Sequence, residues 1–367
     1  MPSHDDVLQA LSRVMDPELG RDIVSLGMVQ DVQVDGGRVA VRIVLTTPAC
    51  PLRDHIQEDV RRALQALPGV QEVDITMDAQ VPQGIRALDL PHIRTAIAVG
   101  SGKGGVGKST VAVNLAVALA DLGASVGLLD ADIYGPNIPR MMGVHRLPPL
   151  TEEGKLRPAE AYGVKLMSIG FLVPPDQPLI WRGPMLHTAI RQFLHDVDWG
   201  ELDYLIIDLP PGTGDAALSV AQLLPLTGAV VVTLPQKVSL DDARRSVEMF
   251  RKLNVPVLGI IENMSYLELP DGTRMDVFGA GGGEALAQEV DAPYLGAIPM
   301  DPDVRKGGDA GKPVVVTQPE APVSKALLEL AKQVAARISV QAVTQPRETP
   351  SGAGGRIPLI RGPRIGR

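Results

Sequence analysis

The sequence predicts an α/β protein in which a small α+β domain precedes a mostly parallel, doubly wound sheet. Between residues 93 and 340, short apolar runs alternate with helical stretches, and a glycine-rich loop follows the first run. Residues 1–80 instead show strands of alternating polarity. Residues 81–92, which carry two prolines and a glycine, predict a linker between the two domains.

The N-terminal domain is predicted to contain two helices and three strands. Apolar residues recur at helical spacing over 4–15 and 52–67. Alternating polarity predicts strands over 29–34, 39–45 and 70–77, and the Asp-Gly-Gly sequence between the first two is typical of a hairpin.

The large domain is predicted to begin with a strand over 93–99, because this run is continuously apolar, as in strands buried on both faces. A helix over 111–122 follows it. The remaining strands are expected at 126–129, 204–207, 229–233 and 257–261, and further helices at 241–253 and 327–338. This alternation is the rhythm of βαβ units in a parallel sheet.

Composition excludes several functional classes. Among 367 residues, 35 basic side chains face 43 acidic ones, and the net charge of −8 argues against a general nucleic-acid surface. Aromatic residues make up only 3%, which disfavours base stacking. No apolar run approaches the ~20 residues needed to span a bilayer, and the first ten residues lack the apolar core of a signal peptide. We therefore expect a cytoplasmic protein without a membrane or nucleic-acid partner.

The C-terminal residues 341–367 predict a disordered basic tail, with five arginines and one glutamate among glycines and prolines. A solvated extension is the favoured interpretation over a segment that binds an acidic partner or nucleic acid. The chain also contains a single cysteine, Cys50, which excludes an intrachain disulfide and a four-thiolate metal site within one chain.

One string matches the phosphate-loop pattern G-x-x-x-x-G-K-[ST] and lies between a predicted strand and a predicted helix. Its glycines aim backbone N–H groups inward, and the helix start adds its positive dipole end. We expect Lys108 to reach the β- and γ-phosphates of ATP, and the Ser109 hydroxyl to coordinate Mg²⁺. The predicted nucleotide-binding string is Gly102-Lys103-Gly104-Gly105-Val106-Gly107-Lys108-Ser109-Thr110.

Acidic residues follow two of the predicted strands. Asp208 ends an apolar strand and is expected to hold Mg²⁺, directly or through water. Asp130 and Asp132 emerge after another strand, at the carboxyl edge where such sheets bind ligands. Together with the phosphate loop, they predict transfer of the γ-phosphoryl group of ATP to water, catalysed mainly by positioning and charge stabilisation.

The phosphate loop, with Lys103 near its start, resembles the deviant Walker A loop of the superfamily of nitrogenase iron protein and septum-site ATPases. The resemblance implies that Lys103 reaches the partner subunit's nucleotide across a homodimer interface. It also implies that Asp132 orients the attacking water, whereas the role of Asp130 stays open.

Longer strings resemble the Mrp/ApbC iron–sulfur cluster carriers over roughly residues 93–320. They include Asp130–Pro139, Asp208–Asp215, Pro235–Asp241, Glu262–Tyr266, Gly279–Gly283 and Ile298–Asp301. The resemblance implies that Asn263 reads the adenine edge. It further implies a homodimeric ATPase that assembles or transfers [4Fe–4S] clusters to client apoproteins, with other iron–sulfur assembly proteins as partners. Met15–Gly20 and Thr46–Pro51 resemble a small iron–sulfur assembly domain that is often fused ahead of such ATPases.

One departure from the family pattern bears on the cluster. The family carries a Cys-x-x-Cys pair shortly after the segment that contains Asn263, but the corresponding residues 267–277 have no cysteine and predict a surface hairpin with Asp271-Gly272 at its turn. Cys50 is then the only available thiolate, shared between subunits or with a client, and a nearby helix start would lower its pKa. The alternatives are a packing role for Cys50 and a cluster-free, nucleotide-dependent switch or scaffold. The six histidines show no metal-ligand spacing, and Trp181 is expected to pack near the dimer face.

Overall fold

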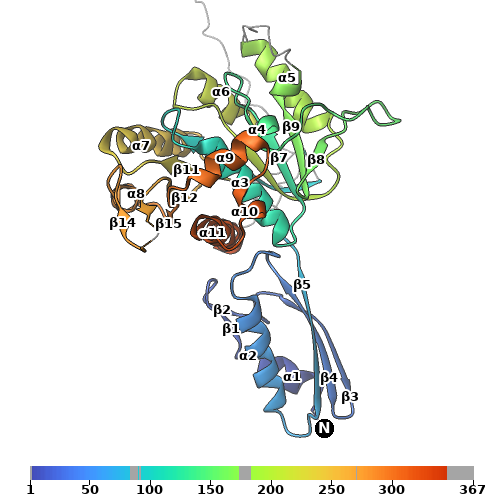
Figure 1. Cartoon of the computed structure of the whole chain (residues 1–367). Helices are drawn as coiled ribbons and strands as arrows, with labels where there is room; N and C mark the ends of the chain where they lie inside the picture. Colours follow the sequence, from blue (N-terminus) through green and yellow to red (C-terminus); the bar gives the residue numbers. More distant parts are fainter. Residues whose placement is uncertain (1, 83–89, 91, 173–182, 270, 345–367) are drawn as a thin grey trace, which may run out of the picture.

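The computed structural model describes residues 2–82, 90, 92–172, 183–269 and 271–344. The larger part of the chain forms an eight-stranded sheet in the order β15-β12-β11-β6-β10-β7-β9-β8 (Figure 1). All neighbouring strands run parallel except β8 and β9, which are antiparallel. The strands are β6 (Ile93–Ser101), β7 (Val126–Asp130), β8 (Ala159–Ala161), β9 (Val164–Ser168), β10 (Leu202–Asp208), β11 (Gly228–Thr233), β12 (Val257–Glu262) and β15 (Tyr294–Ala297).

The strands of this sheet carry apolar side chains on both faces, and helices cover both faces. Along β6, Ile97 and Val99 join one apolar cluster, whereas Ala96 and Ala98 join the other. The first cluster contains α3 (Lys108–Asp121), α4 (Ile138–Met141), α10 (Val314–Thr317) and α11 (Pro322–Thr344). The second contains α5 (Gly183–His195), α6 (Asp215–Leu223), α7 (Lys237–Lys252) and α8 (Gly282–Glu289). The predicted doubly wound α/β fold is confirmed.

The N-terminal part forms a separate three-stranded sheet. It lies below the large sheet in Figure 1, at the end of the strands opposite the phosphate loop. Strands β3 (Val29–Asp35) and β4 (Arg38–Leu45) form the predicted hairpin, and β5 (Glu72–Ala79) pairs parallel to β4. Two amphipathic helices, α1 (His4–Leu11) and α2 (Arg53–Gln65), pack their apolar residues against the sheet.

Several element limits differ from the sequence-based expectations. Helix α1 ends at Leu11, four residues early, because β1 (Met15–Asp16) then pairs with β2 (Arg21–Asp22). Helix α11 continues to Thr344, into the predicted tail, whose residues 345–367 lie outside the described residues, as does Trp181. In the predicted linker, Val81 is fully buried in the apolar core of the large sheet.

The predicted hairpin after β12 is present as β13 (Leu267–Glu268) and β14 (Arg274–Met275), which pair antiparallel. The short helix α9 (Pro302–Ala310) follows β15. No helix in the described part of the chain is long and apolar enough to cross a membrane.

Candidate nucleotide-binding site

The phosphate loop connects β6 to α3 and requires glycine at two close approaches. At Gly107, the N-cap of α3, φ is +84° and an added Cβ would lie 2.2 Å from the Asn263 amide nitrogen. At Gly102, an added Cβ would lie 2.1 Å from the backbone of Asp242, in the second turn of α7. These glycines therefore allow α7 and the residue after β12 to touch the loop.

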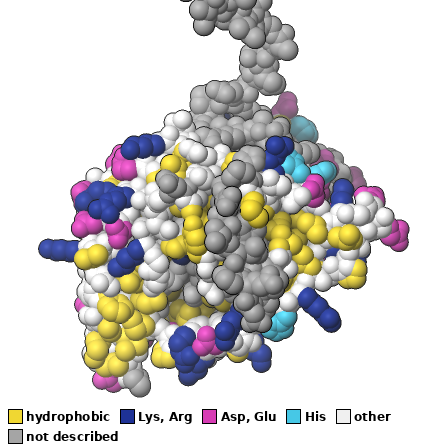
Figure 2. Space-filling view, turned by 90° about the horizontal axis from the view of Figure 1, so that it is seen from above, with side chains coloured by type: hydrophobic (Ala, Val, Ile, Leu, Met, Phe, Trp, Pro, Cys, Tyr) yellow, Lys and Arg dark blue, Asp and Glu magenta, His cyan; other side chains and the backbone are white. Residues whose placement is uncertain are grey.

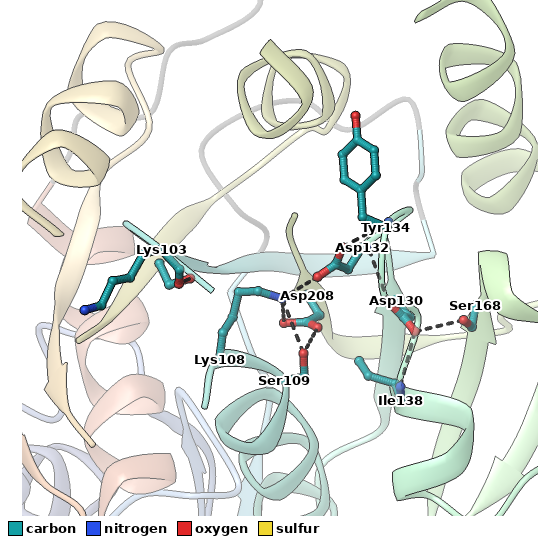
Figure 3. Close-up of polar contacts among 10 residues, drawn as sticks. Lys103, Lys108, Ser109, Asp130, Asp132, Tyr134, Ile138, Ser168 and Asp208 are labelled. Atoms are coloured by element: carbon teal, nitrogen blue, oxygen red, sulfur yellow. Dashed lines mark hydrogen bonds and ion pairs between the residues drawn. The ribbon is translucent and has the colours of Figure 1, made fainter. Parts of the chain in front are cut away.

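Lys108, Ser109 and Asp208 form a connected polar cluster beneath the loop (Figure 3). The Lys108 ammonium donates to Asp208 Oδ1 at 2.7 Å, and the Ser109 hydroxyl donates to Asp208 Oδ2 at 2.6 Å. Lys108 Nζ also lies 3.5 Å from Asp132 Oδ2. Burial raises the pKa of Asp208, but the Lys108 charge and both hydrogen bonds act in the opposite direction.

Asp130 lies beside Asp208 because β7 and β10 pair in register at these two residues. Its carboxylate is fully buried and accepts hydrogen bonds from the Ser168 hydroxyl at 2.9 Å, the Asp132 N–H at 3.2 Å and the Ile138 N–H at 3.3 Å (Figure 3). Burial, and secondly the charge of Asp208, raise the pKa of Asp130 to about 8. Asp130 thus anchors the segment that carries Asp132 and leads into α4.

A cavity of about 640 Å³ opens over this cluster, a size that suits a nucleotide. Its polar end is formed by the phosphate loop and Asp132, and its apolar end by side chains such as Met141, Met264 and Leu327. Of the predicted site residues, the lining includes Lys103, Gly104, Gly105, Gly107, Lys108, Ser109, Thr110, Asp132 and Asn263, whereas Gly102, Val106 and Asp208 do not line the cavity.

The predicted base-reading residue Asn263 reaches the cavity from the end of β12. Its side-chain amide donates to the Val106 carbonyl at 2.8 Å and packs against Gly107. Asn263 therefore touches the phosphate loop directly, and its reading of adenine stays a prediction.

Glu262, the neighbour of Asn263, is a buried carboxylate in a string that resembles the family, but the sequence predicted no role for it. It accepts hydrogen bonds from the Ser265 hydroxyl, from Gly281 N at 3.2 Å and from Gly283 N at 2.5 Å. Glu262 thus holds the chain on both sides of the β13–β14 hairpin, at Ser265 before it and at Gly281 after it. It also caps the start of α8 through Gly283. Its partners are up to 21 residues away in sequence, so no local pattern marks it.

Lys103 is one of the residues that line the cavity, and its side chain points away from Lys108 and Asp208 (Figure 3). Its ammonium group forms no ion pair with any described residue. This orientation leaves the charge available to a group outside the chain.

The Cys50 thiol is not activated, which corrects the expected lowering of its pKa. Helix α2 begins only at Arg53, and the thiol is half-buried against the core of the N-terminal domain. Burial raises the pKa of Cys50 to about 11, and the charges of Glu18 and Asp16 act in the same direction. A hydrogen bond from Leu52 N–H favours the thiolate but is outweighed by burial.

The hairpin at the position of the family's Cys-x-x-Cys pair contains no cysteine, so it offers no thiolate to a metal. Arg274 stacks over the Tyr266 ring at 4.2 Å, and Asp271 accepts from Thr273 N–H within the turn. No group of three or more His, Cys, Asp or Glu side chains placed to hold a metal occurs among residues that the structure describes.

A glycine-rich loop between a parallel strand and a helix, with a Lys–Ser–Asp cluster below it, defines a P-loop nucleotide-binding protein. The family model for the NUBPL iron-transfer P-loop NTPase matches residues 92–335, and the model for the iron-sulfur cluster assembly protein matches residues 4–75. The chain belongs to the family of NUBPL iron-transfer P-loop NTPases and carries an N-terminal domain of the iron-sulfur cluster assembly protein family.

Relatives match over almost the whole chain. An iron-sulfur cluster carrier protein of Synechocystis sp. is 52% identical over 94% of this chain and 100% of its own length. The carrier protein of Deinococcus radiodurans is 51% identical over 95% of this chain and 99% of its own. The chloroplastic Fe-S cluster assembly factor HCF101 of Oryza sativa is 46% identical over 89% of this chain and 62% of its own.

Solved structures resemble the large domain. A nucleotide-binding protein from Archaeoglobus fulgidus, in complex with ADP, has a TM-score of 0.56 and 42% identity over 63% of this chain and 91% of its own. The septum site-determining protein MinD of Pyrococcus horikoshii, complexed with Mg-ADP, has a TM-score of 0.51 and 26% identity over 65% of this chain and 94% of its own.

Proposed function

We propose that this chain is an iron–sulfur cluster carrier that binds and hydrolyses ATP as a homodimer and assembles or transfers clusters to client apoproteins. The observation that carries the proposal is the cluster of Lys108, Ser109 and Asp208 below a nucleotide-sized cavity, in a chain matched along its length by proteins named cluster carriers. Iron–sulfur assembly proteins and apoproteins are its proposed partners.

The residues around the cavity would have different roles in ATP hydrolysis. The ammonium of Lys108 faces the polar end of the cavity, where it would neutralise the β- and γ-phosphates. The Ser109 hydroxyl and the Asp208 carboxylate are hard oxygen donors within hydrogen-bond distance of each other, so they fit Mg²⁺, which would neutralise charge on the phosphates when bound. Asp132 lines the cavity and would orient the attacking water.

Apolar surface at the carboxyl edge of the sheet supports a homodimer that closes over the nucleotide. Figure 2, which looks at the molecule of Figure 1 from above, shows hydrophobic side chains gathered in several places on that face. Tyr134 follows β7, Val238 follows β11, and Met275, Val277 and Phe278 follow β12, and all five are exposed. Lys103 points away from its own phosphate loop, as a residue that contacts a partner's nucleotide must.

The cluster, as cargo, needs ligands other than those of the family pattern. Four thiolates cannot come from two copies of this chain, because each copy has only Cys50. A carrier would therefore hold a cluster through Cys50 together with a client or a small thiol. The same observation favours a second candidate function, in which the chain is a cluster-free, nucleotide-dependent switch or scaffold for protein partners.

Anaerobic reconstitution with iron and sulfide separates the two functions. A carrier should show cluster absorption and a Mössbauer signal, which the Cys50→Ser variant should lose while it keeps its ATPase activity. A wild-type protein that hydrolyses ATP but binds no cluster would rule out the carrier and leave the switch. We further propose a cytoplasmic location, which cell fractionation tests directly.

A further inference from the structure

The loop between β4 and α2 contacts the large domain through its buried residues Thr47 and Ala49, each only 1% exposed. Ala49 belongs to the apolar cluster that also contains α3 and α11. The Thr47 hydroxyl lies 2.9 Å from the hydroxyl of Tyr204, a fully buried residue near the start of β10. This loop is therefore an interdomain contact at the amino end of the strands, opposite the end that carries the phosphate loop.

The Thr47–Tyr204 contact is a hydrogen bond between two hydroxyl groups in an apolar setting. Burial raises the pKa of Tyr204, and among the described residues Thr47 is the hydrogen-bond partner of its hydroxyl. An unpaired buried hydroxyl costs free energy, so each group stabilises the position of the other. Thr47 Oγ1 also accepts from Ala49 N–H at 3.1 Å, which shapes the loop around the contact.

The thiol of Cys50 is next to this contact. Cys50 directly follows Ala49. The charge of Glu18 raises the pKa of the thiol, and the pKa of Glu18 is in turn influenced by the charges of Arg337 and Glu329 in α11. The only thiol of the chain thus lies beside the junction at which the N-terminal domain meets the large domain.

We infer that Tyr204 is a positioning residue that latches the Thr47–Cys50 loop onto the large domain, and that this latch restrains the half-buried Cys50 thiol, so that reagents reach it faster when the two domains separate. The inference does not depend on a bound cluster, because it concerns only access to the thiol.

Thiol labelling of the native full-length protein with 5,5′-dithiobis(2-nitrobenzoic acid) tests the latch. One cysteine per chain means that each modified chain releases one thionitrobenzoate. We expect the wild type to react at least tenfold more slowly than the urea-unfolded chain at the same pH. Tyr204→Phe should raise the native rate about fivefold, the factor for the loss of one hydrogen bond.

Tyr162→Phe is the matched control, because the Tyr162 hydroxyl donates to the Gly311 carbonyl at 2.7 Å within the large domain. Thr47→Val removes the same interdomain bond from the other side and replaces Tyr204→Phe if that variant does not fold, as judged by ADP binding. Faster labelling in either variant, with the control unchanged, supports the latch. Wild-type labelling at the unfolded rate, unchanged labelling in both variants, or an equal increase in the control overturns it.

Discussion

At the scale of single residues, the nucleotide site gathers ionisable side chains that are largely shielded from bulk solvent. Lys108 is 5% exposed and Asp208 is fully buried, so their ion pair is screened little by solvent. Asp130 lies beside this pair and is held by three donors. The removal of one charge would leave the others uncompensated, and substitutions here should act strongly.

Lys108→Ala should abolish tight nucleotide binding, because it removes the charge that faces the phosphates and leaves Asp208 unpaired. We expect affinity for ATP, measured by isothermal titration calorimetry, to fall by at least 100-fold. Lys103→Ala is the comparison: its side chain points away from the cluster, so it should keep binding within about threefold and lose hydrolysis. Equal loss of binding and hydrolysis in Lys103→Ala would contradict the cross-dimer role.

Cys50 should make the stability of the protein depend on alkaline pH. Its pKa is about 11 in the folded chain, above the value of 9.0 for a free thiol. The folded state therefore favours the neutral thiol, so this contribution to stability is complete below pH 9 and is lost as the pH rises towards 11. Urea unfolding from pH 8 to 11 should show a steeper loss for wild type than for Cys50→Ala. Parallel curves would contradict the burial of the thiol.

At the scale of elements, Glu262 joins three parts of the structure. The end of β12, the base of the β13–β14 hairpin and the start of α8 all depend on its two carboxylate oxygens. The adjacent Asn263 contacts the phosphate loop. The hairpin is therefore attached to the same short segment as the nucleotide site.

Glu262→Gln should loosen the hairpin and α8, because an amide has one acceptor oxygen where the carboxylate has two. We expect the free energy of unfolding in urea to fall by about 2 kcal/mol, as for lost charge-assisted hydrogen bonds. Hydrogen exchange should show reduced protection at Gly281 and Gly283. Glu268→Gln, at an exposed hairpin residue, is the control and should change neither measurement. Unchanged protection in Glu262→Gln would disprove the proposed clamp.

At the scale of the whole molecule, the two ends of the strands in the large sheet are occupied differently. The carboxyl ends of the strands carry the nucleotide cavity and exposed apolar side chains, whereas the N-terminal domain lies at the amino ends (Figure 1). This division leaves the nucleotide face free to meet a second copy of the chain.

ATP should therefore favour dimers through the carboxyl edge. Sedimentation velocity with Mg-ATP should show a dimer for wild type, and Met275→Glu should shift it towards monomer because it places a charge in the apolar surface of the hairpin. Met275 is 50% exposed. Val316→Glu is the control, since Val316 is 44% exposed but lies on α10, which packs beside α11. A dimer that both substitutions weaken equally would argue against this face.

Local spacing predicted the strands of the large domain that are continuously apolar, the phosphate loop, and the hairpin at Asp271-Gly272. Strands β8, β9 and β15 were not anticipated, because short runs such as Tyr294–Ala297 carry too few residues for a periodic signal. The Ser168–Asp130 and Thr47–Tyr204 contacts were also invisible, since 38 and 157 residues separate their partners.

The sequence by itself determined that this chain is a doubly wound α/β protein with a phosphate loop, because those features depend on residues that are close along the chain. Only the tertiary structure decided what surrounds each side chain. It raised the pKa of Cys50 where a nearby helix start predicted a lower one, and it joined Glu262 to the base of the hairpin. The physical reason is that desolvation and hydrogen bonding depend on atoms brought together from distant segments, which no local spacing encodes.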